Sequence, residues 1–171
     1  MNIGIDVDGV LCDLEWFQKT YAIPFFEKRG FTLLDEDAYD VKEMFGCSKK
    51  DHLSFWGLRI IKYALAMPAR ENAAEVLLRL HEDGHKVFIV TGRVCVTEKS
   101  LFGSAHRWML RHWLKRNNLY YDDIFFCSEK NSAQDKAKAC KELGIEGNFE
   151  QLNDYPANNN LKYVISWIGS N

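Results

Sequence analysis

Apolar and polar positions in the second part of the chain follow two alternating patterns. Stretches with helical spacing and short, continuously apolar runs succeed one another in this order: 73–80 (helix), 86–90 (strand), about 100–117 (helix), 124–127 (strand) and about 132–143 (helix). Gly84 and Gly144 follow two of the helical stretches and are typical of helix ends. Short strands without a polar face are typical of a parallel sheet with helices on both sides. The pattern therefore predicts an α/β fold.

The segment 14–70 has a different pattern, with many aromatic residues at helical rather than strand spacing. Near its start they recur about four or five positions apart: Trp16, Phe17, Tyr21, Phe25 and Phe26. A polar stretch at 35–40 separates this predicted helix from the next. We expect the aromatic side chains mainly to pack a small helical module. The predicted organisation is a core formed by 1–13 and 71–171, with a helical insert at 14–70.

Composition and charge narrow the class of protein. The chain has 171 residues, enough for one core and a small inserted module. A net charge of −2 argues against a nucleic acid polymer as partner, and the sequence has no apolar run long enough to cross a membrane. The five cysteines are odd in number, widely spaced and without a CxxC pair, which favours free thiols in a reducing compartment. We therefore expect a cytoplasmic globular protein.

Two carboxylates follow the first apolar run, in the sequence Ile3-Gly4-Ile5-Asp6-Val7-Asp8-Gly9. Alternation along an extended chain would aim Asp6 and Asp8 in the same direction. Two like charges at the end of a buried strand are costly unless a cation or a reacting group offsets them. A divalent metal ion is the simplest such partner, so the pair predicts a metal or catalytic site.

Two segments carry a resemblance to a known family. Asp6 and Asp8, followed by Gly9 and the apolar pair Val10-Leu11, resemble motif I of the haloacid dehalogenase (HAD) superfamily. Thr91-Gly92-Arg93, at the end of the predicted strand 86–90, resembles motif II. In the family, that hydroxyl and the next backbone N–H hold the transferring phosphoryl group, which suits donors aimed at developing negative charge. Arg93 is a candidate contact to the substrate by its position.

The remaining two family motifs have counterparts further along the chain. Motif III is a lysine near the start of a helix, for which Lys136 is the first candidate and Lys130 the second. The segment Asn153-Asp154-Tyr155-Pro156-Ala157-Asn158 resembles motif IV, with Asn153 in place of the first of two acids. The resemblance then assigns Asp154 to a metal site.

The resemblance implies a Rossmann-like core with a C1-type helical cap at 14–70. It also implies a magnesium-dependent phosphomonoester hydrolase in which Asp6 attacks phosphorus and forms an aspartyl-phosphate. Asp8 would serve as general acid and then general base, an acid at this position favouring phosphatase over dehalogenase chemistry. Thr91 and Lys136 complete the implied catalytic set, and Gly92 and Arg93 would bind the substrate.

Mg²⁺ is the implied cofactor, held by Asp6, the backbone carbonyl of Asp8, and Asp154. The group most similar to this chain is the 5'-nucleotidase or deoxyribonucleotidase type, so the expected substrate is a small phosphorylated metabolite, such as a (deoxy)nucleoside monophosphate. A sugar phosphate is the alternative substrate. A binding or scaffold protein with a decayed metal site, suggested by Asn153, is the alternative function, and phosphotransfer to an acceptor other than water shares the same intermediate. The sequence makes no prediction of oligomeric state.

Overall fold

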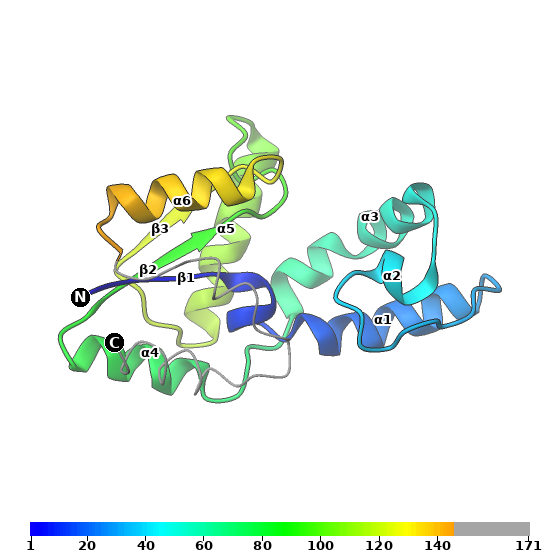
Figure 1. Ribbon diagram of the computed structural model, residues 1–171, viewed down its shortest axis with the longest axis horizontal. Helices are drawn as coiled ribbons and strands as arrows, with labels where there is room; N and C mark the ends of the chain where they lie inside the picture. The colour runs from blue at the N-terminus through cyan, green and yellow to red at the C-terminus, as the bar shows by residue number, and fades with distance from the viewer. Residues whose placement is uncertain (146–171) are drawn as a thin grey trace. The chain divides into compact units, whose positions relative to one another are not determined.

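A computed structural model describes residues 1–145 of the chain (Figure 1). The chain divides into two compact units. One unit contains Met1–Cys12 and the described residues from Ala69 onward, and the other contains Asp13–Pro68. None of the helices in the described part is both long and apolar enough to span a membrane.

The first unit is built on a parallel sheet. Its three described strands are β1 (Asn2–Ile5), β2 (Lys86–Thr91) and β3 (Asp123–Phe126), in the spatial order β1-β2-β3. Ile5 is level with Ile89, and Thr91 is level with Phe126. The strands are short and lack a polar face, as a sheet covered by helices requires. The predicted α/β fold with a Rossmann-like core is confirmed.

Three helices accompany the sheet: α4 (Ala73–Glu82), α5 (Leu101–Arg116) and α6 (Ser132–Glu142). Both α4 and α6 contact β2, and Figure 1 shows them on opposite sides of the strands. On the α6 side, Val90, Cys127 and Ala139 form a buried cluster. Val87 and Ile89, two other buried residues of β2, alternate with Phe88 and Val90 and so point to the opposite face.

Strand β1 has neighbours on both of its edges. Ile145, just after α6, forms a parallel bridge with Asn2, whose side-chain amide donates a hydrogen bond to the carbonyl oxygen of Leu143 at 2.5 Å. The chain thus runs from β1 through β2 to β3 on one side and then returns to the other side of β1. In open α/β sheets, ligands bind at the carboxyl end of the strands where the order reverses in this way. That position is the residue after β1, Asp6.

The second unit is helical, as its pattern predicted. It contains α1 (Leu14–Glu27), α2 (Val41–Phe45) and α3 (Lys49–Ala66). Each begins at a side chain that accepts a hydrogen bond from a backbone N–H of the first turn: Asp13, Asp40 and Ser48 respectively. Phe17, Phe26 and Phe55 are fully buried. Aromatic packing therefore forms the core of this unit.

The loop between β2 and α5 is tied to the start of that helix. The Arg107 guanidinium donates hydrogen bonds to the carbonyl oxygens of Val96 at 2.7 Å and Glu98 at 2.9 Å. Gly103 lies under the same loop, where an added Cβ would overlap the carbonyl oxygen of Glu98 and approach that of Cys95 to 2.9 Å. The close approach of this backbone requires glycine at position 103.

Replacing Gly103 by alanine should therefore destabilise the protein. The new methyl group meets backbone oxygens that cannot rotate away, a strain of about 1–3 kcal/mol. Gly57→Ala in α3 is the matched control, because no atom lies within 4 Å of its added Cβ. Both positions are helical and gain up to about 1 kcal/mol of helix propensity from alanine, so the difference between their urea midpoints reports mainly the overlap. Equal midpoints would contradict the tight loop packing.

Candidate active site

Asp6 leaves the end of β1 in an extended conformation and begins an irregular turn, η1 (Val7–Leu11). One of its carboxylate oxygens, Oδ1, accepts a hydrogen bond from the backbone N–H of Val7 at 2.8 Å. Asp8 is extended within this turn, and Gly9 has φ +78°, a conformation that side chains rarely adopt. The turn therefore places two carboxylates just beyond the strand and sends the chain away from the sheet.

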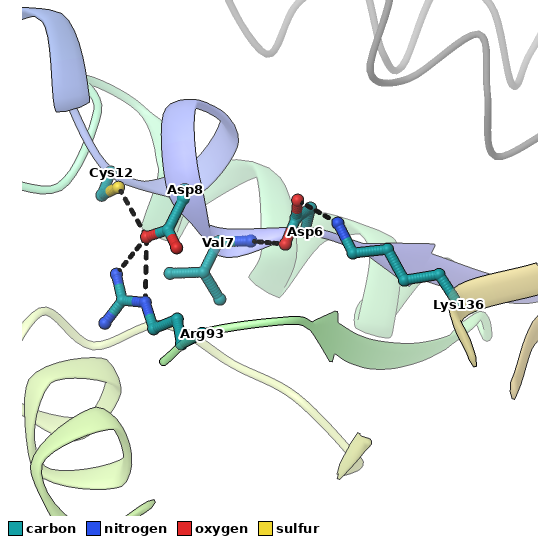
Figure 2. Close-up of polar contacts among 6 residues, drawn as sticks. All are labelled: Asp6, Val7, Asp8, Cys12, Arg93 and Lys136. Atoms are coloured by element: carbon teal, nitrogen blue, oxygen red, sulfur yellow. Dashed lines mark hydrogen bonds and ion pairs between the residues drawn. The ribbon is translucent and has the colours of Figure 1, made fainter. Parts of the chain in front are cut away.

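The Asp6 carboxylate is buried against a lysine from α6. Lys136 Nζ lies 2.5 Å from Asp6 Oδ2, and the two side chains are only 8% and 10% exposed (Figure 2). Burial raises the pKa of the Asp6 carboxyl above its ordinary value; Lys136 lowers this pKa, and the negative charge of Asp8 raises it. Of the two lysines considered for this position, Lys130 is exposed. The structure thus brings Lys136 to the nucleophile candidate.

Asp8 is paired with a second cation. Arg93 donates two N–H groups to Asp8 Oδ1, from Nε at 2.9 Å and from Nη2 at 2.6 Å, and the Cys12 thiol donates to the same oxygen at 3.7 Å. Figure 2 shows Asp6 turned toward Lys136 and Asp8 turned toward Arg93. The expectation that alternation aims both carboxylates the same way is wrong, because β1 ends at Ile5 and Asp8 belongs to the turn.

Thr91 and Gly92 stand at the end of the neighbouring strand. Because Ile5 is level with Ile89, Thr91 comes level with the residue after Asp6. Its hydroxyl oxygen is fully buried and has no hydrogen-bond partner among the described residues. A buried hydroxyl without a partner is costly, so a bound oxygen from a ligand would satisfy it. An added Cβ at Gly92 would overlap the Ser132 hydroxyl at the start of α6 and come within 3.0 Å of the Ser132 Cβ, so glycine favours this close approach.

The predicted metal site is only partly within the described residues. Asp154 lies outside them, and the described part holds no cluster of three or more His, Cys, Asp or Glu side chains that could bind an ion. The two acids that are described, Asp6 and Asp8, supply the oxygen donors that hard cations such as Mg²⁺ prefer. A buried carboxylate whose pKa is raised would also be relieved by a nearby cation. This donor set fits magnesium.

Arg70 supports the turn, a role that the sequence did not predict. Its Nε donates to the carbonyl oxygen of Gly9 at 3.2 Å, and its backbone N–H donates to that of Leu11 at 2.9 Å. The two residues joined by the side-chain bond are 61 positions apart, so no local pattern could have indicated the contact.

Comparison with known proteins gives one distant similarity. No family model matches the chain. A protein of Chlorobaculum tepidum, named "Putative 5'(3')-deoxyribonucleotidase", is 25% identical over 130 residues. The similarity covers 75% of this chain and 63% of that protein, so the matched region is less than two thirds of the relative's length.

Removing the lysine from the buried pair should destabilise the fold in a pH-dependent way. Lys136→Met leaves the Asp6 carboxylate buried without its partner, at a cost of about 3–5 kcal/mol at neutral pH. Because the pKa of Asp6 is raised in the folded state, stability from this group is present at low pH and falls as pH rises. The deficit should shrink as pH is lowered and be smallest below about 4, where the acid is also protonated in the unfolded chain.

The measurement is urea unfolding at several pH values, with Lys138→Met as control. Lys138 lies on the same helix, is 75% exposed, and contacts Glu142 at 3.8 Å. Such an exposed pair contributes less than about 0.5 kcal/mol. Two results would contradict a stabilising role of the buried Asp6–Lys136 pair: a Lys136 variant as stable as the Lys138 variant, or a loss of stability that does not change with pH.

Proposed function

We propose that the protein is a HAD-type phosphomonoester hydrolase that acts through an aspartyl-phosphate on Asp6. The observation that carries the proposal is the buried Asp6–Lys136 pair at the carboxyl end of β1, where the sheet order reverses. The buried Thr91 hydroxyl at the end of the neighbouring strand, which has no hydrogen-bond partner among the described residues, supports it. The similarity to a protein named as a deoxyribonucleotidase supports the same reaction class.

In the first step, a carboxylate oxygen of Asp6 attacks phosphorus and the bond between phosphorus and the leaving oxygen breaks. Asp8 donates a proton to that oxygen, so the product departs as an alcohol. The Thr91 hydroxyl and the Gly92 N–H would donate to the phosphoryl oxygens as negative charge develops on them. Lys136 holds Asp6 in place and opposes the rise in its pKa, which favours the ionised form that attacks.

In the second step, water attacks phosphorus in the aspartyl-phosphate. Asp8, now ionised, accepts the proton from the water, and the bond between phosphorus and Asp6 breaks. Inorganic phosphate leaves, and both carboxyl groups return to their starting states. A pair of carboxyl groups in different environments can divide acid, base and nucleophile roles in this way.

Mg²⁺ would be held by Asp6, the backbone carbonyl of Asp8, and Asp154. When bound, it offsets the negative charge of the substrate and of the nucleophile during transfer. The resemblance to capped members of the family also gives the helical unit the role of a cap that selects the substrate. The name of the similar protein makes a (deoxy)nucleoside monophosphate the first substrate to test, with sugar phosphates second.

The test is phosphate release from a panel of nucleoside monophosphates, sugar phosphates and p-nitrophenyl phosphate, with magnesium and with a chelator. We expect release that requires magnesium and that Asp6→Asn reduces to background, because an amide oxygen cannot form the intermediate. Loss of Asp8 as acid and base, in Asp8→Asn, should lower the rate roughly 10²–10⁴-fold on esters with alkoxide leaving groups.

The matched control is Asp13→Asn, five residues after Asp8. Asparagine can still accept the capping hydrogen bond that Asp13 accepts from Trp16, so this variant should keep wild-type activity. Wild-type release no greater than that of Asp6→Asn would contradict the proposed hydrolase and favour a binding protein with the same fold.

A further inference from the structure

We propose that Arg93 is a positioning residue for Asp8 and does not bind the phosphate of the substrate. The inference rests on the proposed function, in which Asp8 moves the proton. Arg93 was a candidate substrate contact because it follows Thr91 and Gly92 in the sequence. In the structure, the guanidinium is directed at the Asp8 carboxylate instead (Figure 2).

Two N–H groups of Arg93 converge on the same oxygen of Asp8. Nε lies at 2.9 Å and Nη2 at 2.6 Å from Oδ1, and the Cys12 thiol donates to that oxygen as well. Charge-assisted bonds of this kind are short and strong, and two of them from one planar group hold Oδ1 of Asp8 in place.

Arg93 is itself held by its surroundings. Its side chain is only 10% exposed, and its guanidinium carbon lies 5.9 Å from the ring centre of Trp113. Trp113 is fully buried in α5, so the ring is a fixed surface for the guanidinium. Arginine is suited to this place because its planar group can lie near an aromatic ring while its N–H groups bind a carboxylate, a combination that lysine cannot reproduce.

A positioning role predicts a dependence on the leaving group. A misplaced Asp8 slows departure of an alkoxide, which needs a proton, and leaves departure of p-nitrophenolate, a weak base, nearly unchanged. A substrate contact would instead be lost equally for both esters, because both carry the same phosphate. The first turnover separates the two cases, since the later hydrolysis of the aspartyl-phosphate is common to both substrates.

The experiment is rapid-quench measurement of first-turnover product release by Arg93→Met and Arg93→Lys. The two substrates are p-nitrophenyl phosphate and the best alkyl ester of the wild-type panel. We expect Arg93→Met to lose roughly 10²-fold on the alkyl ester, in the rate rather than in the KM, and little on p-nitrophenyl phosphate. Arg93→Lys keeps the charge and should recover part of the loss. Asp8→Asn should show the same selectivity between leaving groups.

Arg111→Lys is the matched control on α5. The Arg111 guanidinium lies 5.2 Å from the ring centre of Phe126 and is outside the proposed catalytic set, so this variant should behave as wild type. Thermal unfolding of each variant shows whether it is folded at the assay temperature. If Arg93→Met is unfolded there, the comparison of the two esters is made with Arg93→Lys. Equal loss on both esters with a raised KM, or no loss at all, overturns the positioning role. An inactive wild type would instead overturn the proposed function.

Discussion

The burial of a carboxylate at the end of β1 is the constraint on which the described site depends. Asp6 cannot remain charged in this position without a cation, because removing a carboxylate from water costs several kcal/mol. Lys136 supplies that cation from α6, the helix that contacts β2 and leads to the bridge between Ile145 and Asn2 of β1. The topology of the sheet and the chemistry of the site are therefore linked through one ion pair.

A second requirement is a sharp departure of the chain from the sheet. The turn after β1 needs Gly9 at positive φ. Arg70 holds the turn by donating hydrogen bonds to the backbone carbonyl oxygens of Gly9 and Leu11. Glycine also favours the close approach at position 92, where the end of β2 meets the Ser132 side chain. Both positions lie at the carboxyl ends of neighbouring strands.

Local pattern predicted much of the first unit. The strand expected at 86–90 is Lys86–Thr91, and the helix expected at about 100–117 is Leu101–Arg116, because burial on this sheet follows the periodicity of apolar residues. Local pattern could not predict which cations pair with the two carboxylates of the site. Asp8 and Arg93 are 85 positions apart, and periodicity carries no information on such a pair. The family resemblance ranked Lys136 ahead of Lys130, and the fold brings Lys136 to Asp6. Asp154, the predicted metal ligand, lies outside the described residues.

The charges of the site suggest how substrate and cofactor depend on each other. Before Asp8 takes up the proton that it later donates, the two ionised carboxylates of Asp6 and Asp8 are matched by one ammonium and one guanidinium, so these four groups sum to zero. A phosphate monoester dianion entering alone would leave two uncompensated negative charges in a partly buried place, where Coulomb repulsion is weakly screened. A divalent cation entering with it restores the balance. The pairing seen in the described residues thus favours joint binding of metal and phosphate over binding of phosphate alone.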